Sequence, residues 1–432
     1  MFAVCRRRVT RTGFPRAKRS VILASRLDGI GDGMSSRHIR SRSCSRVLPI
    51  CGALLASALL AGVLLPGLVA AQTASDHPGS QPDRKVVLVT LDGVRVQELF
   101  GGMDDVIASA GETDSGIYEP DVTRKRYWRA TPQERREALM PFFWKQLAPA
   151  GMVLGNQALG STVKVRNSQW FSYPGYSEIL TGQPQPDVVS NDIVRYPHET
   201  VLDFVHRELK LRYTDVAQIG SWDGFKMAAS RTDGTFFMNG AYDLVPPELS
   251  NPEMDYAGRL RTQVMELWEE GSNDAVTFRI GLAYLKKHEP RVLWLGMGGS
   301  DDWSHARRYD RLLDYLHLAD QFLAELWTTL QSLDAYRGRT TLIVTTDHGR
   351  GRTPKDWAEH DAGIPGCDDI WLAIIGPDTP ALGEVRKYAP VTQSDIAATM
   401  LQYLGVDYRK FNAQAGPPVP GSLKTGESSA KP

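Results

Sequence analysis

Cysteine is scarce in this chain, and its positions leave no pair for a structural disulfide in the body of the protein. The 432 residues contain four cysteines. Cys5, Cys44 and Cys51 precede the point where we expect an N-terminal segment to end, so Cys367 stands alone beyond it. A disulfide framework is therefore excluded for the remainder. The fold must be held together by burial of apolar side chains, which a chain of this length can supply.

An excess of either charge is also missing from the whole chain, because 50 Lys and Arg balance 50 Asp and Glu. The balance is uneven along the sequence. Residues 1–46 carry 12 Lys and Arg against Asp28 and Asp32, which leaves 38 basic and 48 acidic residues beyond them. An acidic remainder lacks the basic surface that nucleic-acid binding requires. We therefore expect no nucleic-acid partner.

One long apolar stretch, residues 47–71, follows this basic opening and ends in small residues. The order of charged, apolar and small residues is typical of a secretory signal. We expect residues 1–71 to be a targeting segment, with Met34 as an alternative start, and the protein to be periplasmic or secreted. The 25-residue stretch is also long enough to span a bilayer. An uncleaved N-terminal membrane anchor is therefore the alternative, and membrane contact is expected only in that case.

Strand and helix patterns alternate between residues 85 and 411. The predicted strands lie within residues 85–93, 214–222, 291–302, 340–349 and 369–377. The predicted helices lie within residues 131–148, 308–331 and 391–405. Thr131 and Glu134 form a capping box for the first helix, and Gly405 ends the last one. This alternation predicts an α/β domain over residues 85–411, with a mainly parallel central sheet and helices on both faces.

The segments that flank this domain are polar or rich in turn-forming residues. Residues 72–84 are predicted to be a linker. Residues 412–432 are rich in Pro, Gly and Ser, a composition typical of disorder, and are predicted to be a disordered tail.

Side chains that bind metals recur at or near the ends of the predicted strands. They are Asp92, Asp301, His305, Asp347, His348 and His360. Ligands of α/β sheets gather beyond the carboxyl ends of the strands, and one helical turn would place Asp301 and His305 on the same face. Each residue alone has an ordinary explanation as a turn, cap or surface residue. Carboxylates and imidazoles together suit zinc, and six such residues fit two divalent metal ions better than one.

The segment Asn167 to Gln183 contains three serines that could act as a nucleophile beside the metals. A serine at the start of a helix lies near free N–H groups that bind anions. Metal coordination would also lower the pKa of its hydroxyl. Ser168, Ser172 and Ser177 all remain candidates on spacing alone.

The complete pattern resembles the alkaline phosphatase superfamily, especially its nucleotide pyrophosphatase/phosphodiesterase branch, with sulfatases as more distant relatives. In that superfamily the nucleophile often stands two residues before a proline, and Thr-Gly follows at a fixed interval. The sequence S-Y-P-G-Y-S-E-I-L-T-G matches this pattern. Ser172 then corresponds to the nucleophile, Thr181 and Gly182 to the Thr-Gly pair, and Ser177 is set aside.

The resemblance also implies roles for the remaining residues. One metal is expected to be held by Asp92, Ser172, Asp347 and His348. The second is expected to be held by Asp301, His305 and His360. Asn191 is the expected counterpart of an asparagine that contacts a phosphoryl oxygen in the phosphodiesterase branch.

These expectations predict an exported, metal-dependent hydrolase of small-molecule phosphoesters that works through a phosphoseryl intermediate. Phosphate transfer to an alcohol, by a phosphotransferase or mutase, would use the same covalent step. A sulfatase-like hydrolase would require oxidation of Ser172 to formylglycine, and the S-Y-P-G sequence lacks the arginine of the usual sulfatase signature. The non-enzymatic alternative is an exported metal-binding protein. The sequence leaves open the substrate, the choice between monoester and diester, and the oligomeric state.

Overall fold

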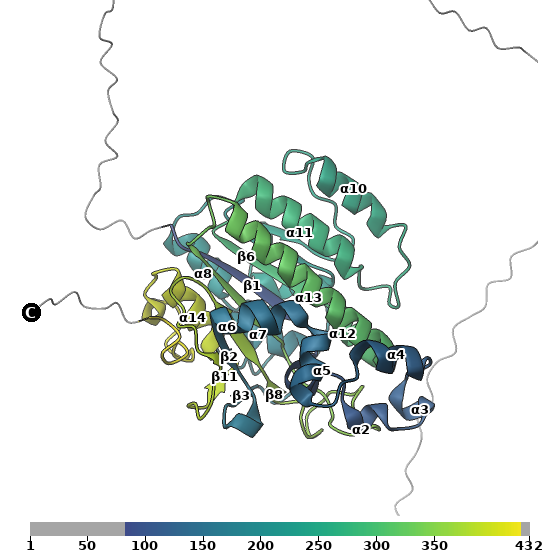
Figure 1. The fold of residues 1–432 in the computed structure, drawn as a ribbon. Helices are drawn as coiled ribbons and strands as arrows, with labels where there is room; N and C mark the ends of the chain where they lie inside the picture. Colours follow the sequence, from purple (N-terminus) through teal and green to yellow (C-terminus); the bar gives the residue numbers. More distant parts are fainter. Residues whose placement is uncertain (1–82, 425–432) are drawn as a thin grey trace, which may run out of the picture. The chain divides into compact units, whose positions relative to one another are not determined.

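The computed structural model describes residues 83–424 (Figure 1). The predicted targeting segment, residues 1–71, and nearly all of the predicted linker lie outside the described residues. Within residues 83–424, no helix has both the length and the apolar character needed to cross a membrane.

An eight-stranded sheet forms the centre of the described chain. Its strands are β1 (Lys85–Leu91), β2 (Gly151–Leu154), β4 (Val216–Gly220), β5 (Phe237–Asn239), β6 (Val292–Met297), β7 (Thr340–Thr345), β9 (Leu372–Ile375) and β10 (Gly383–Glu384). They are ordered β10-β2-β9-β7-β1-β6-β4-β5. Neighbouring strands run parallel except where β9 pairs with β2 and β7. The predicted mainly parallel sheet is therefore confirmed.

A second, three-stranded sheet is ordered β11-β3-β8. Its strands are β3 (Val163–Lys164), β8 (Asp369–Ile370) and β11 (Val391–Thr392). The predicted strand at residues 369–377 is thus divided between two sheets. The division falls at Trp371, whose buried indole N–H donates a hydrogen bond to the carbonyl of Val94 at 3.0 Å.

Helices cover the central sheet on both faces. The longer ones are α4 (Pro120–Tyr127), α5 (Pro132–Leu139), α7 (Ser172–Thr181), α8 (Val201–Glu208), α9 (Asp223–Ala229), α10 (Pro252–Arg261), α11 (Asp274–His288), α12 (Gly299–His305), α13 (Tyr309–Ser332) and α14 (Asp395–Tyr403). The shorter ones are α1 (Val96–Gly101), α2 (Asp105–Ala108), α3 (Glu112–Ser115), η1 (Phe143–Leu147), α6 (Ala148–Ala150), η2 (Gln157–Leu159) and η3 (Tyr408–Lys410).

Alternate residues of β1 supply the two halves of the core. Val87 and Val89 pack with side chains of α1, α5, α11 and α13. Val86 and Leu88 pack with side chains of α7, α8, α9 and α14. A strand buried on both faces needs apolar side chains at every position, which explains the continuous apolar run of β1.

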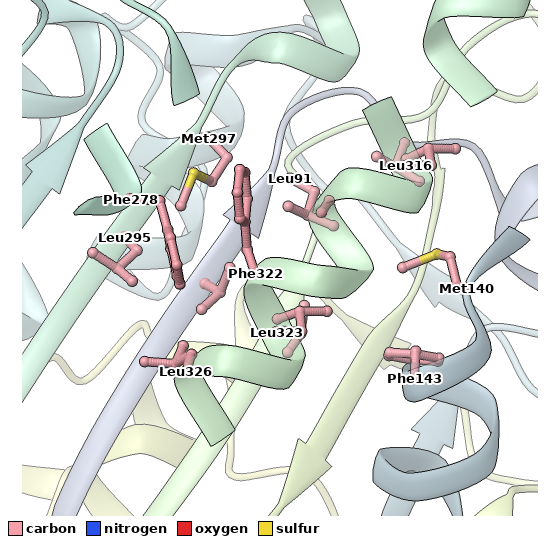
Figure 2. Close-up of a cluster of buried hydrophobic side chains, with 14 of the residues drawn as sticks. Leu91, Met140, Phe143, Phe278, Leu295, Met297, Leu316, Phe322, Leu323 and Leu326 are labelled. Atoms are coloured by element: carbon pink, nitrogen blue, oxygen red, sulfur yellow. The ribbon is translucent and has the colours of Figure 1, made fainter. Parts of the chain in front are cut away.

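The first half of the core is built around α13 (Figure 2). Phe322 stacks on Phe278 of α11, with ring centroids 4.5 Å apart. Leu326 belongs to the same buried cluster as Leu91 of β1 and Leu295 of β6. Each such side chain stabilises the fold by about 1.5–3 kcal/mol when fully buried. The apolar face expected for residues 308–331 is therefore the face that covers the sheet.

The helix predicted for residues 131–148 is interrupted. The capping box of Thr131 and Glu134 is present at the start of α5. The helix then ends at Leu139, and η1 continues in a wider π-helical turn from Phe143. Pro141 explains the interruption, because proline has no N–H and its ring clashes with the preceding turn.

Residues 412–424 were expected to be disordered, and that prediction is wrong. Val419 is 1% exposed and its N–H donates to Thr399 Oγ1 at 2.9 Å. The carbonyl of Ser422 accepts a hydrogen bond from the hydroxyl of Tyr403. Composition misled the prediction because few apolar side chains anchor this segment: Val419 is buried, and Ala415 and Leu423 pack against the same core cluster. Residues 425–432 lie outside the described part of the chain.

Candidate active site

Three adjacent parallel strands bring the predicted ligands to one edge of the sheet. β1 lies between β6 and β7, and Leu91 is in register with Met297. Asp92 directly follows β1, and Asp347 follows β7. The first turns of α12, which follow β6, carry Asp301. Because the three strands run in the same direction, residues that are far apart in the sequence lie close together at the carboxyl ends of the strands.

The first group of donor atoms centres on His348. Its Nε2 atom lies 3.3 Å from Asp92 Oδ1 and 3.4 Å from Asp347 Oδ2. Ser172 Oγ lies 3.5 Å from the same nitrogen. All four side chains are buried. These are the four residues that the resemblance assigned to one metal.

The second group contains the other three predicted ligands. His305 Nε2 lies 3.2 Å from Asp301 Oδ2 and 2.9 Å from His360 Nε2. His360 Nε2 is 3.6 Å from Asp301 Oδ1. His348 Nε2 is 3.9 Å from the same oxygen, so the two groups adjoin. The structure thus brings together every residue that was predicted as a ligand.

The spacing and state of these donor atoms fit metal ions. A tetrahedral zinc site with ordinary bond lengths separates its ligand atoms by roughly 3.3 Å, close to the distances above. Asp92 Oδ1 and Asp347 Oδ2 are buried and have no hydrogen-bond partner among the described residues. Burial, with the Asp92 carboxylate nearby, raises the pKa of Asp347 to about 7. A buried carboxylate oxygen without a partner is unfavourable, and a cation would remove that penalty.

The imidazole of His360 is held in the form that binds metals. Burial, together with the positive charge of Arg350, lowers the pKa of His360 well below its usual value. A neutral imidazole has a free lone pair for a metal ion. Burial likewise lowers the pKa of His305.

The turn that precedes Ser172 is fixed by a carboxylate from the same helix. Glu178 accepts hydrogen bonds from the backbone N–H groups of Arg166 and Asn167, at 3.1 Å and 2.7 Å. Its other oxygen accepts from the hydroxyl of Ser394 at 2.7 Å. A buried carboxylate with several donors is strongly held. Glu178 therefore anchors the segment from which Ser172 enters the site.

Helix α7 begins at Ser172, with Pro174 in its first turn. Proline is tolerated in the first turn of a helix because N–H groups there have no helical partner. The expected free N–H groups are fewer than predicted, since Pro174 has none and that of Tyr173 donates to Asn191 Oδ1 at 2.9 Å. Asn191 itself lines the cavity beside Ser172.

The other two candidate serines do not line the cavity beside the donor groups. Ser168 is exposed and its hydroxyl accepts a hydrogen bond from Gln169 Nε2. Ser177 is buried within α7. Neither residue lines the cavity described below, whereas Ser172 and Asn191 do. The geometry therefore agrees with the choice made from the resemblance.

Several supporting residues escaped prediction. The hydroxyl of Tyr176 donates to Asp92 Oδ2 at 2.9 Å, and its position four residues after Ser172 on α7 was an available signal. Arg350 is buried, donates to the Gly93 carbonyl at 3.2 Å and forms an ion pair with Asp301. Its place two residues after His348 was a similar signal.

The start of α12 is held by Asp274, the first residue of α11. Its buried carboxylate accepts the N–H groups of Gly298 and Gly299, at 3.2 Å and 2.7 Å. It also accepts the hydroxyl of Tyr315. Because Asp301 and His305 lie on α12, these bonds set the position of two predicted ligands.

A cavity of about 210 Å³ opens beside the donor groups. Its lining includes Asp92, Ser172, Asn191, Asp301 and His305, together with Trp222, Trp268, Glu270 and Asp302. No lysine or arginine is among the residues that line it. Burial, with the carboxylates of Asp274 and Asp92 nearby, raises the pKa of Asp302 to about 8.

Comparison with known proteins identifies the fold. No family model matches the chain, and no curated protein resembles it in sequence. Wild-type alkaline phosphatase PafA superposes with a TM-score of 0.51 at 11% identity, over 80% of this chain and 100% of that one. The 2-O GAG sulfatase BT1596 gives 0.49 at 12% identity, over 77% and 72% of the two chains. The lipoteichoic acid synthase LtaP from Listeria monocytogenes gives 0.46 at 12% identity, over 75% and 72%.

The match to PafA shows that this chain has the fold of the alkaline phosphatase superfamily. The resemblance inferred from the motif around Ser172 is therefore confirmed at the level of the fold.

Proposed function

We propose that this protein is a metal-dependent phosphoester hydrolase that works through a phosphoserine at Ser172. The observation that carries the proposal is the convergence of one serine hydroxyl with two adjoining groups of metal-binding donors beside one cavity. A serine placed 3.5 Å from His348 Nε2 is arranged for activation rather than for capping a helix.

The residues suit two divalent ions, preferably zinc. Asp92, Asp347, His348 and Ser172 would hold one, and Asp301, His305 and His360 the other. Two bound zinc ions would supply positive charge for the attacking and leaving oxygens of an in-line displacement.

Hydrolysis then proceeds through two displacements at phosphorus. In the first, Ser172 loses its proton to solvent and its Oγ forms a bond to phosphorus while the bond to the alcohol oxygen breaks. The alcohol leaves after taking up a proton. In the second, a water oxygen attacks phosphorus, the bond to Ser172 Oγ breaks, and phosphate leaves as Ser172 regains a proton. Asn191 Nδ2 would donate to a phosphoryl oxygen in both steps.

Two further parts of the proposal rest on the sequence. The N-terminal pattern of residues 1–71 supports export to the periplasm or the medium. The expected partner is a small-molecule phosphoester. Transfer of the phosphoryl group to a second alcohol would use the same first displacement, and an excess of added glycerol would reveal it as glycerol phosphate.

A serine exchange tests the proposal. Purified protein would be assayed with aryl phosphate monoesters, phosphate diesters and sulfate esters, and its metals measured by elemental analysis. We expect Ser172→Ala to lose phosphoester turnover by at least about a thousandfold while retaining bound zinc. Ser168→Ala is the matched control and should keep wild-type rates. Equal rates for Ser172→Ala and the wild type would remove Ser172 from the mechanism.

A further inference from the structure

We propose that the cavity selects phosphoesters whose alcohol carries an alkylammonium group, as in choline or ethanolamine. The inference rests on the proposed function and names its substrate class. Beyond the predicted metal ligands, the cavity offers two tryptophans and the carboxylate of Glu270, with no lysine or arginine in its lining. That combination is suited to a cation rather than to a second anion.

Trp222 provides the first aromatic surface, and its ring is fixed. The ring makes edge contacts with Tyr173 and Phe225, with centroids 6.4 Å and 5.6 Å apart. A Cβ atom on Gly224 would lie 2.2 Å from the indole ring, so the glycine leaves room for it. A ring held in this way loses little conformational freedom when a ligand binds.

Trp268 provides the second surface from a neighbouring segment. Gly271 forms an antiparallel bridge with Trp222, and the N–H of Ser272 donates to the carbonyl of Ser221 at 2.7 Å. These bonds tie the segment that carries Trp268 to the wall formed by Trp222. Trp268 is 48% exposed although it lines the cavity, so its ring has surface available to a ligand. Aromatic faces attract alkylammonium groups through their quadrupoles.

Glu270 supplies a carboxylate at the lining of the cavity. Its side chain is exposed and forms no hydrogen bond or ion pair with any residue in the range 83–424. A substrate that carries further negative charge would be repelled by this carboxylate. A cationic substituent would instead be attracted to it while its phosphoryl group lies at Ser172.

Nucleotides are the main competing substrate class, because a base could stack on either tryptophan. A nucleotide has no positive charge that could pair with Glu270, however. The lining also has no lysine or arginine to bind its additional phosphates. The charge of the cavity therefore favours the alkylammonium ester.

A pair of isosteric substrates isolates the effect of the charge. Phosphocholine and 3,3-dimethylbutyl phosphate have the same shape, but the cationic nitrogen of the first is replaced by an uncharged carbon in the second. Both monoesters would be assayed, together with the p-nitrophenyl diester of each. We expect kcat/KM to be at least about tenfold higher for the choline ester. Glu270→Gln and Trp268→Leu should each bring this ratio toward one. Glu269→Gln, an exposed neighbour outside the cavity lining, should leave the ratio unchanged.

The outcomes separate the two proposals. Turnover that depends on Ser172 but is equal for the charged and neutral esters would overturn the selectivity and leave the hydrolase standing. Binding gives an independent readout when no ester reacts: choline should quench tryptophan fluorescence in the wild type, and less so in Trp268→Leu, whereas 3,3-dimethylbutanol should not. Absence of both turnover and choline quenching would overturn the two proposals together.

Discussion

Gly175 sets the distance between Ser172, the proposed nucleophile, and Asp347, a proposed metal ligand. It lies in the first turns of α7, and a Cβ atom there would be 2.7 Å from the carbonyl oxygen of Asp347. Real side chains do not approach backbone oxygens so closely. The helix that begins with Ser172 therefore packs directly on the segment that carries Asp347.

An alanine at this position should separate the two elements. Within a helix, Gly→Ala usually stabilises by about 1 kcal/mol, but Gly175→Ala should instead lower the free energy of unfolding by about 1–3 kcal/mol through overpacking. It should also reduce bound metal and activity. Urea denaturation and elemental analysis would measure both effects.

The matched control is Gly101→Ala at the end of α1, where an added Cβ meets nothing within 4 Å. It should be as stable as the wild type or slightly more so. If the two alanine variants behaved alike, the close approach of α7 to Asp347 would not be a constraint.

Single residues of the site divide into those that local pattern can predict and those that it cannot. Asp92, Asp347 and His348 stand where apolar strands stop, a signal present in the sequence itself. Glu270 and Trp268 reach the cavity only because the Trp222–Gly271 bridge brings their segment there. No local pattern encodes such a contact, so these two residues appear only with the fold.

At the scale of elements, the position of α12 depends on a side chain from another helix. Asp274 accepts two backbone N–H groups at the start of α12 and the hydroxyl of Tyr315. Removal of its charge should loosen the helix that presents Asp301 and His305. Residues that orient ligands in this way typically change metal affinity by about 10–100-fold.

We therefore expect Asp274→Asn to weaken zinc binding by about 10–100-fold, measured by competition with a chromophoric chelator. Asp121→Asn, an exposed residue in the first turn of α4, is the control and should bind zinc as the wild type does. Undiminished affinity in Asp274→Asn, with α12 still folded, would show that the ligands need no such support.

The elements themselves were predictable to different degrees. α13 followed from its regular apolar face, and the start of α5 from its capping box. The division of residues 369–377 between two sheets was not predictable, because it depends on where Trp371 is buried. The periodicity of apolar residues predicts which face of a helix or strand is buried. It does not predict which other element packs against that face.

At the scale of the molecule, residues 412–424 close one side of the core beside α14. Val419 packs in the same cluster as Val86 of β1 and Ile396 of α14. Its full burial should contribute about 1.5–3 kcal/mol, to which the hydrogen bonds with Thr399 and Tyr403 add.

Deletion of residues 412–432 should therefore lower the free energy of unfolding by at least about 2 kcal/mol, measured by urea denaturation. A chain that lacks only residues 425–432 is the reference for this comparison. If both truncated chains unfolded at the same urea concentration, the packing of residues 412–424 would contribute nothing to stability.

The central position of β7 has a consequence for the order of events in the life of the chain. The proposed ligands are drawn from Asp92 to His360, and β7 must pair with β1 before Asp347 and His348 face Asp92. A ribosome therefore has to complete most of the polypeptide before the two donor groups exist. If the proposed metal ions bind, they can do so only after β7 has joined the sheet, and a nascent fragment that stops short of β7 would hold neither donor group in full.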